Sequence, residues 1–423
     1  MLEINTLRQS KEIVIKGLAK RNLHAERILD EILEKDSEWR GAKTEMEVIS
    51  AKLNQLSKII GEYFQQGKQK EADELKNATG ELKMRESLLK LQVEELDIQI
   101  SNLMYSLPNI PNELVKQGKS AEDNEIIFEK GEAPLYNFDP LPHWDLVKKF
   151  NLIDFELGVK VTGAGFPFYI GKGAKLQRAL IQFFLDEAEK EGYTEYIAPF
   201  MVNEASATGT GQLPDKEGQM YHSPTDNFYL IPTAEVPLTN IYRDVVFPSE
   251  DFSIKLTGYT PCFRREAGSY GKDVRGLNRL HQFDKVEIVR IEHPSNTARA
   301  LDEMVEYVKK LLEKLGLQFR ILRLCGGDMG FASALTYDFE VYSAAQQKWL
   351  EVSSVSRFDT FQSNRLKLRF KTADKKTQLC HTLNGSALAL PRILASILEN
   401  FQDQNGIQIP EVLNKYLTFS RIE

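Results

Sequence analysis

The sequence predicts an α+β protein in which two long N-terminal helices precede a domain built on an antiparallel sheet. Apolar residues recur at intervals of seven from residue 32 to residue 103, which is the spacing of a coiled coil. After Trp144 the chain changes to short strand-like runs joined as hairpins, with helical stripes between groups of strands. This order of elements is typical of an antiparallel sheet with helices on one face.

The heptad repeats predict an antiparallel helical hairpin. A polar segment around Gly67 separates two seams of similar length, and helices joined by so short a turn fold back on each other. Pro108 and Pro111 end the second helix, so we place a domain boundary near residue 110, between segments 1–110 and 111–423. A dimerisation coiled coil or a plain spacer remains an alternative. The seam residues are Ile32, Trp39, Met46, Leu53 and Ile60, with Ala42, Ile49, Leu56 and Tyr63 beside them, then Leu75, Leu82, Leu89, Leu96 and Leu103.

Helical and strand periods divide the remainder of the chain. A helical stripe runs to Gly192, which is suited to end it, and a following strand is interrupted at Pro199, as expected for an edge or an interface. A second helix covers Arg299 to Leu315. Near the C-terminus, a strand is expected to turn at Asn384-Gly385 and to continue as an apolar helix from Leu388. Short strands are expected around residues 228–231, 254–260, 282–291, 319–324, 337–342 and 348–355.

Composition sets the class of protein. The chain has 423 residues, 42% of them hydrophobic and 27% charged, as in a soluble globular protein. It shows no signal-peptide core and no apolar run long enough for a membrane span, so we expect a cytoplasmic protein. Cys262, Cys325 and Cys380 lack the spacing of a disulfide framework or a zinc site. The net charge of −7 by itself argues against a nucleic-acid partner, although basic residues do gather toward the tip of the predicted arm.

The segment from Pro261 to Val289 is the best candidate for a nucleotide site. It reads as a strand, a glycine loop with Gly268, Gly271 and Gly276, and a second strand. Arginines suit phosphates, a ring suits a base, and carboxylates accept from amino groups. An amphipathic hairpin with solvated charges is the plainer alternative. The chain has neither a P-loop nor a GxGxxG motif after a strand, so a sheet face is expected to hold the nucleotide. The candidate side chains are Arg264, Arg265, Glu266, Arg279, Phe283 and Glu287.

Arg392 is a further candidate because it lies in an otherwise apolar helix. A guanidinium group in such surroundings usually has an anionic partner, although it can also extend to water.

Taken together, these runs resemble the bacterial seryl-tRNA synthetases, which are class II aminoacyl-tRNA synthetases. The resemblance extends over essentially the whole chain, and the segments around Pro199, Arg264 and Arg392 resemble the three signature motifs of class II. It departs from the usual pattern at Arg357 and Phe358, at Pro391 and at Ala387. The matching runs are GTGQLP from Gly209, TAE from Thr233, FRREAGS from Phe263, RLHQFDKVE from Arg279, EVSS from Glu351 and HTLNGSALALPR from His381.

The resemblance implies a role for each candidate residue. Arg264 and Arg392 are implied as catalytic. Glu351 and Ser354 are implied as ligands of Mg²⁺, which accompanies ATP, and no zinc is implied. ATP binding is implied for Arg264, Arg265, Glu266, Arg279, Phe283, Glu351, Val352, Ser353, Ser354 and Arg392, and serine binding for Thr233, Ala234, Glu235, Arg264, Glu287 and Ser386.

The implied function is a serine–tRNA ligase. Such an enzyme activates L-serine with ATP to seryl-adenylate and transfers serine to the 3′ end of tRNA(Ser). Whether tRNA(Sec) is also a substrate stays open. The resemblance further implies a class II catalytic domain, a homodimer formed through the segment containing Pro199, and an N-terminal arm that binds tRNA by shape and backbone. The alternatives are a homologue that loads a carrier protein, another class II synthetase, and a non-catalytic paralogue that binds RNA or protein through the coiled coil.

Overall fold

The computed structural model describes residues 1–215, 217–266 and 275–423. The chain divides into two compact units. The helical unit comprises Leu2–Lys16 and Leu23–Pro108, and the larger unit comprises Met1, Gly17–Asn22 and Asn109–Glu423.

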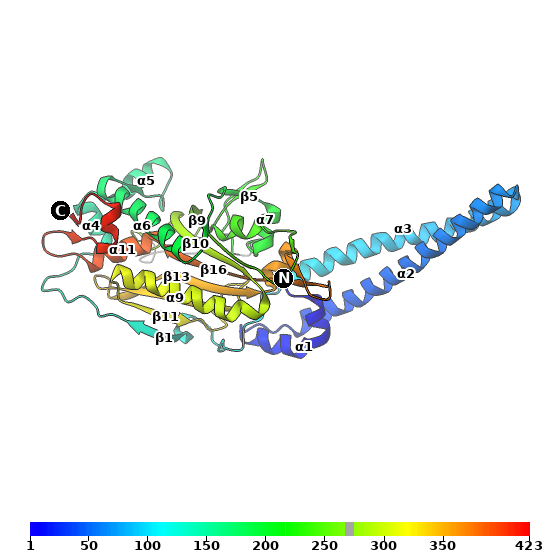
Figure 1. Ribbon diagram of the computed structural model, residues 1–423, viewed down its shortest axis with the longest axis horizontal. Helices are drawn as coiled ribbons and strands as arrows, with labels where there is room; N and C mark the ends of the chain where they lie inside the picture. The colour runs from blue at the N-terminus through cyan, green and yellow to red at the C-terminus, as the bar shows by residue number, and fades with distance from the viewer. Residues whose placement is uncertain (216, 267–274) are drawn as a thin grey trace. The chain divides into compact units, whose positions relative to one another are not determined.

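The helical unit is an antiparallel hairpin of two long helices, as the heptads predict. Helix α1 (Ile4–Ala19) is followed by α2 (Glu26–Gln65) and α3 (Gln69–Ser106), which lie side by side (Figure 1). Gly67 adopts a φ of +71° in the turn between them, a conformation that glycine tolerates best. The buried seam includes Ala42, Ile49, Leu53 and Leu89, with Met46, Leu82 and Val93 packed against them.

The larger unit is built on one eight-stranded sheet. Its strand order is β1-β11-β12-β13-β16-β10-β9-β4. All neighbours pair antiparallel except β4 and β9, which are parallel. The prediction of an antiparallel sheet is therefore confirmed. The strands are β1 (Glu125–Lys130), β4 (Thr194–Glu195), β9 (Ser253–Phe263), β10 (Gln282–Glu292), β11 (Phe319–Arg323), β12 (Leu335–Ser343), β13 (Lys348–Asp359) and β16 (His381–Ala389).

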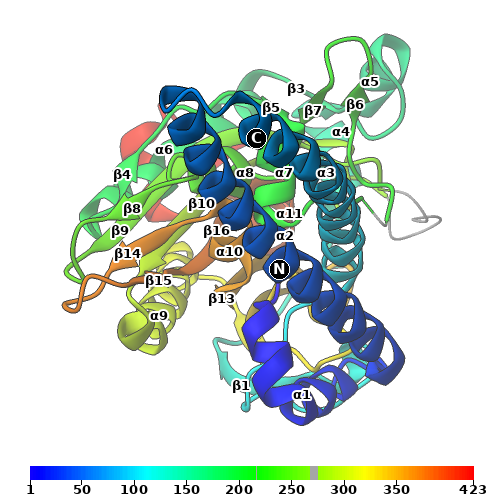
Figure 2. The same cartoon turned by 90° about the vertical axis from the view of Figure 1, so that its right-hand side faces the viewer.

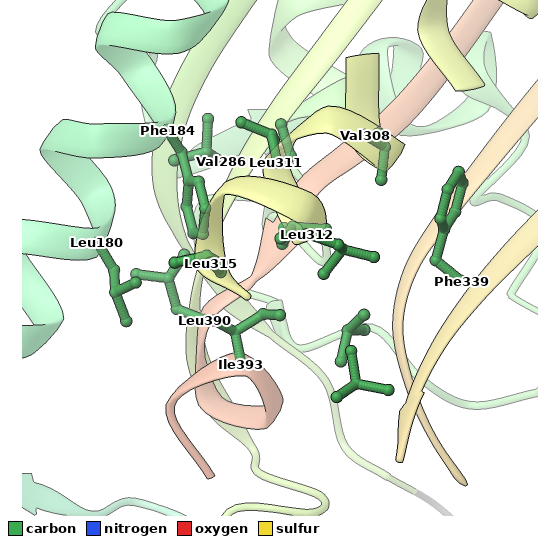
Figure 3. Close-up of a cluster of buried hydrophobic side chains, with 14 of the residues drawn as sticks. Leu180, Phe184, Val286, Val308, Leu311, Leu312, Leu315, Phe339, Leu390 and Ile393 are labelled. Atoms are coloured by element: carbon green, nitrogen blue, oxygen red, sulfur yellow. The ribbon is translucent and has the colours of Figure 1, made fainter. Parts of the chain in front are cut away.

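Three helices cover the apolar side of this sheet: α6 (Gly171–Lys190), α9 (Thr297–Leu315) and α11 (Leu390–Asn400). Figure 3 shows their side chains meeting those of β10 and β12. Gly192 has a φ of +83° just beyond α6, so it ends that helix as predicted. The labelled core residues are Leu180 and Phe184 of α6, Val308, Leu311, Leu312 and Leu315 of α9, Leu390 and Ile393 of α11, Val286 of β10 and Phe339 of β12.

Shorter elements surround the sheet, and β8, β14 and β15 form a small sheet of their own (Figure 2). No helix in the described ranges is long and apolar enough to cross a membrane. The short helices are α4 (His143–Lys149), α5 (Phe155–Val161), α7 (Glu204–Thr210), α8 (Glu235–Asn240) and α10 (Phe361–Leu366), with 3₁₀ turns at Ala121–Asp123, Pro294–Asn296 and Glu411–Tyr416. The short strands are β2 (Ile153–Asp154), β3 (Phe168–Tyr169), β5 (Met201–Asn203), β6 (His222–Ser223), β7 (Phe228–Leu230), β8 (Val246–Phe247), β14 (Arg369–Lys371), β15 (Thr377–Leu379), β17 (Ile407–Gln408) and β18 (Arg421–Ile422).

The predicted turn at Asn384-Gly385 is wrong. Both residues lie inside β16, which pairs with β10 on one side and with β13 on the other. A Cβ atom on Gly385 would lie 2.9 Å from the Cγ2 atom of Val355, so the glycine permits close approach of two strands rather than a turn. Leu388 consequently belongs to the strand, and α11 begins only at Leu390.

The predicted strand positions of Arg264 to Glu266 also need correction. Strand β9 ends at Phe263, and the backbone N–H of Arg264 still donates to the carbonyl oxygen of His281 over 2.9 Å. Glu266 has a φ of +49°, so the extended conformation does not continue to that residue. The second strand of that hairpin is β10 (Gln282–Glu292), which agrees with the predicted strand around residues 282–291.

Candidate active site

A cavity of about 460 Å³ opens on the face of the sheet formed by β10, β13 and β16. Segments more than a hundred residues apart in sequence contribute to its wall. The predicted site residues that line it are Thr233, Glu235, Arg264, Glu266, Arg279, Phe283, Glu287, Glu351, Val352, Ser353, Ser354, Ser386 and Arg392.

Two predicted site residues do not line this cavity. Ala234 is fully buried and packs against Leu238, Leu256 and Val289 on the other side of its segment. The backbone N–H of Arg265 donates to the carbonyl oxygen of Gln219, 3.0 Å away. The predicted glycines Gly268 and Gly271 lie outside the described residues.

The nucleotide candidates meet at one end of the cavity. Phe283 of β10 presents its ring, and the Arg264 guanidinium carbon lies 5.2 Å from the ring centroid. Arg279 donates to Glu266 over 3.0 Å, which fixes the carboxylate at the edge of the same space. An aromatic face beside a carboxylate and two guanidinium groups can hold a purine ring and its phosphates.

Arg392 lies in the first turn of α11 and points back toward the sheet. Its Nε atom donates to the carbonyl oxygen of Asn278 over 3.0 Å, and its Nη1 atom donates to the carbonyl oxygen of Glu351 over 2.6 Å. Its distance to the Glu351 carboxylate is 3.4 Å. The guanidinium group is thus held by two backbone carbonyls at the cavity wall, with its remaining donors available to an anion.

A β-bulge places Glu351 and Ser354 on the same side of β13. While β12 advances by one residue, its pairing partners on β13 change from Ser353 to Glu351, so Val352 is an extra residue. In a regular strand, residues three apart would face opposite sides of the sheet. The bulge is consistent with both Glu351 and Ser354 lining the cavity.

The other end of the cavity is acidic and enclosed. Glu287 accepts from the Thr233 hydroxyl over 3.0 Å and lies 2.5 Å from the Lys285 ammonium. Glu235 accepts from the side-chain amide of Gln362 over 2.5 Å. Burial raises the pKa of Glu235 to about 7, and the charge of Glu287 acts in the same direction. Burial also raises the pKa of Glu287, although Lys285 opposes that shift.

The sequence analysis missed several cavity residues. Lys285 is the most informative, because it stands two residues from both Phe283 and Glu287 on β10 and so shares their face. That alternation was visible in the sequence and could have identified it. The other missed wall residues are Gln212, Glu217, Gln219, Pro232, Leu277, Asn278, Leu280, Asn384, Ala389 and Pro391.

A buried histidine and carboxylate pair supports the nucleotide end of the cavity from behind. The Nδ1 atom of His143 lies 2.6 Å from the Glu399 carboxylate, and its Nε2 atom accepts from the backbone N–H of Leu277 over 2.8 Å. Gln346 donates to the same carboxylate over 2.9 Å, and the Ser343 hydroxyl also donates to it. Glu399 lies on α11, so the helix that carries Arg392 also fixes the wall segment at Leu277.

Within the described ranges, no group of three or more His, Cys, Asp or Glu side chains is arranged to hold a metal ion. Glu351 and Ser354 nevertheless offer oxygen atoms at the phosphate end of the cavity, and Mg²⁺ is commonly held by one or two carboxylates together with substrate phosphates.

Comparison with known proteins gives consistent matches. Residues 1–111 match the seryl-tRNA synthetase N-terminal domain, and residues 220–401 match the class II tRNA synthetase core domain for G, H, P, S and T. A serine–tRNA ligase of Salinibacter ruber is 49% identical over 100% of this chain and 99% of its own. That of Methylacidiphilum infernorum is 45% identical over 98% and 99%.

The solved structures agree with these matches. The crystal structure of the seryl-tRNA synthetase from Pyrococcus horikoshii, complexed with ATP, superimposes with a TM-score of 0.92 at 33% identity, over 100% of this chain and 99% of that one. Identity of nearly half the residues over the full length, together with the shared fold, establishes common family membership. The chain belongs to the seryl-tRNA synthetase family of class II aminoacyl-tRNA synthetases.

Proposed function

We propose that the cavity carries out both steps of serine–tRNA ligation, namely formation of seryl-adenylate from L-serine and ATP and transfer of serine to tRNA(Ser). One observation carries the proposal. The side chains of a single strand, β10, reach from an aromatic ring at Phe283 to a buried carboxylate at Glu287 within one cavity. A nucleotide and a small amino acid can therefore lie end to end across this strand.

ATP would occupy the end with the aromatic ring. The base stacks on Phe283, and its amino group donates to Glu266. Arg264 binds the α-phosphate, and Arg392 binds the γ-phosphate of a bent triphosphate. Glu351 and Ser354 would hold Mg²⁺, which supplies charge neutralisation for the phosphates when bound. The remaining nucleotide contacts are assigned to Arg279, Val352 and Ser353, which line the cavity. Arg265 does not line it and is left without a nucleotide contact.

Serine would occupy the acidic end. Its ammonium group pairs with Glu235 and Glu287, and its hydroxyl hydrogen-bonds to Glu287 and Ser386, next to Thr233 and Ala234. Such hydrogen bonds discriminate strongly against alanine, because alanine leaves buried polar groups unpaired. Threonine differs by one methyl group, and its exclusion by shape is worth only about 1–3 kcal/mol.

The first step forms a bond between a serine carboxylate oxygen and the α-phosphorus. The bond from that phosphorus to the bridging oxygen breaks, and pyrophosphate leaves with the electron pair. In the second step, a hydroxyl of the terminal adenosine of tRNA attacks the serine carbonyl carbon, and AMP leaves. No covalent enzyme nucleophile is required, so positioning and cationic side chains supply the catalysis.

We assign tRNA binding to the arm, residues 1–110, and catalysis to residues 111–423. Exposed lysines and arginines on α3 include Lys76, Lys83 and Lys90, which suit a phosphate backbone. We further propose a homodimer formed through the segment around Pro199. Its neighbour Ile197 is 91% exposed, and Phe200 and Met201 are also exposed. These side chains form an exposed apolar surface of the kind that a subunit interface buries.

Serine-dependent ATP–pyrophosphate exchange tests the proposal, with alanine, threonine and cysteine assayed in parallel. Arg264→Ala is expected to stop exchange and to leave the fold intact. Near-normal exchange by that variant would remove the proposed mechanism. Deletion of Arg40 to Lys90 is expected to preserve exchange and abolish aminoacylation, whereas equal loss of both would give the arm a different role. A non-catalytic paralogue would show no exchange with any amino acid.

A further inference from the structure

Lys285 is a buried cation at the centre of the cavity, and the roles proposed above leave it unused. On β10 it lies between Phe283 and Glu287, and all three line the cavity. Positions two apart on a strand are separated by about 6.6 Å. Lys285 therefore stands midway between the proposed base site and the proposed ammonium site.

That midpoint is where the reacting atoms must lie. In a bound pair of ATP and serine, the ribose separates the base from the α-phosphorus, and one carbon separates the serine ammonium group from its carboxylate. With the base on Phe283 and the ammonium on Glu287, the α-phosphate and the serine carboxylate meet opposite Lys285.

The surroundings of Lys285 keep its side chain in place without a substrate. Both side chains are buried: Lys285 is 6% exposed and Glu287 is 2% exposed. The distance from Nζ to Glu287 Oε2 is 2.5 Å, and this carboxylate is the one ion-pair partner of Lys285 within residues 1–215, 217–266 and 275–423. A buried ammonium group without a partner is costly, so removal of this contact forces Lys285 toward another anion.

Serine competes for that contact. Its ammonium group has the same chemistry as the lysine Nζ, and the proposed function places it on Glu287. Lysine carries its charge on a flexible four-carbon stem, so Nζ can change partners without movement of the strand. The charge of Lys285 also acts on Glu235, but the proposed function places the serine ammonium group on that carboxylate too. The anions that remain for Nζ are then the serine carboxylate and the α-phosphate.

The other cavity cations are anchored differently. Arg279 pairs with Glu266, and Arg392 is held by backbone carbonyls. Arg264 donates to the Pro232 carbonyl oxygen over 3.4 Å and lies over the Phe283 ring. Its charge acts on Glu287, but it makes no ion pair with a carboxylate among the described residues. Lys285 is thus the cavity cation whose anchor is the group that serine itself is expected to bind.

We propose that Lys285 is a catalytic residue that exchanges partners. It neutralises Glu287 in the empty site and moves to a non-bridging oxygen of the α-phosphate once serine binds. Lys285 transfers no proton in this step. As the carboxylate oxygen bonds to phosphorus and pyrophosphate leaves, its hydrogen bond stabilises the negative charge on the transferred phosphoryl group. This inference rests on the proposed function.

The exchange links activation to the presence of serine. With ATP alone, Lys285 remains on Glu287 and the α-phosphate lacks one cation. A small molecule that carries both an ammonium group and a carboxylate is needed to release it.

The test compares Lys285→Met with the matched control Lys255→Met. Lys255 lies on the neighbouring strand β9 and donates to the carbonyl oxygen of Glu191 over 2.9 Å, outside the cavity. In ATP–pyrophosphate exchange, Lys285→Met is expected to lower kcat by about 10²–10³-fold, the usual effect of removing one oxyanion donor. The KM for ATP is expected to change little, and Lys255→Met is expected to behave as wild type.

A second variant keeps the inference testable if Lys285→Met does not fold. Lys285→Ala leaves space for a small ammonium ion, and added ethylammonium is expected to restore part of its kcat. A kcat for Lys285→Met within about threefold of wild type, with only the KM for serine raised, would overturn the inference. It would reduce Lys285 to a counter-ion of Glu287. Absence of rescue in a folded Lys285→Ala protein would also count against it. Failure of the proposed function is distinct, because wild type itself would then show no serine-dependent exchange.

Discussion

Replacement of Glu235 by glutamine is expected to stabilise the protein while it impairs the reaction. Glu235 is 8% exposed and lies near a second carboxylate, Glu287. Its Oε1 atom accepts from the amide of Gln362, whose own oxygen accepts from the Thr382 hydroxyl, so the amide orientation is fixed. Glutamine can keep an acceptor oxygen toward Gln362, removes the charge, and presents an amide NH2 group in place of the second carboxylate oxygen.

The magnitude follows from the pKa of Glu235, which burial and the Glu287 charge raise from 4.5 to about 7. A raised carboxyl pKa means that the folded state binds the proton more tightly than the unfolded state. The associated stability is therefore fully present below pH 4.5 and is lost as the pH rises through about 7. The pKa difference of 7 − 4.5 = 2.5 lowers the free energy of unfolding, relative to its value at low pH, by roughly 3 kcal/mol at pH 8 and by about 1 kcal/mol at pH 5.

The assay is urea unfolding of wild type and Glu235→Gln at pH 5 and pH 8, followed by circular dichroism. The variant is expected to gain roughly 3 kcal/mol over wild type at pH 8 and about 1 kcal/mol at pH 5. In exchange, it is expected to lose affinity for serine, because the ammonium group loses a counter-charge. Equal stabilities of the two proteins at pH 8 would refute the reasoning, as would a difference that does not depend on pH.

Glu399→Gln is the matched control, because its expected effect on the free energy of unfolding has the opposite sign. Burial alone would raise the pKa of Glu399, but hydrogen bonds from His143 and Ser343 outweigh burial and lower the pKa. The stability that this carboxylate contributes is present above pH 4.5 and is lost as the pH falls. Glu399→Gln is therefore expected to destabilise the protein at pH 8, where Glu235→Gln stabilises it.

Three further predictions concern separate parts of the chain. Phe283→Ala is expected to raise the KM for ATP in exchange by about 5–150-fold, equivalent to 1–3 kcal/mol of base stacking, and an unchanged KM would place the base elsewhere. Ile197→Asp is expected to convert a dimer into monomers in sedimentation, and a monomeric wild type would contradict the proposed interface. Leu89 is 1% exposed in the coiled coil, so Leu89→Ala is expected to cost the arm about 2–5 kcal/mol and to leave exchange intact, as measured by limited proteolysis and exchange assays.

Local periodicity made the helices and most strands of this chain predictable. Leucines at heptad spacing bury themselves against a second helix of the same spacing, and the short polar turn at Gly67 favours the helix of the same chain. Leu89 and Ile49 accordingly meet across a hairpin. Strand β10 was predictable because alternating side chains fix which residues share a face. The same reasoning extended to Phe283 and Glu287 in the cavity, and it should have included Lys285.

Features that depend on long-range pairing could not be read from local pattern. Asn384-Gly385 has the composition of a turn, yet strands on both sides supply hydrogen bonds that outweigh the local preference. The bulge at Val352 exists only as a mismatch between two strands, so the sequence alone does not show that Glu351 and Ser354 face the same way. Ala234 stands between two cavity residues, Thr233 and Glu235, in the sequence, yet its own side chain packs into the core.

The position of β10 between β9 and β16 explains why so many site residues depend on one register. Glu287 pairs with Gly258 on β9 and with Ser386 on β16. A shift of one residue would turn Phe283, Lys285 and Glu287 away from the cavity together. The register is held by buried apolar residues on the opposite face, among them Val286 and Ile288, which are fully buried. The core packing beneath the sheet therefore fixes both the spacing between the two substrate sites and the cation that lies between them.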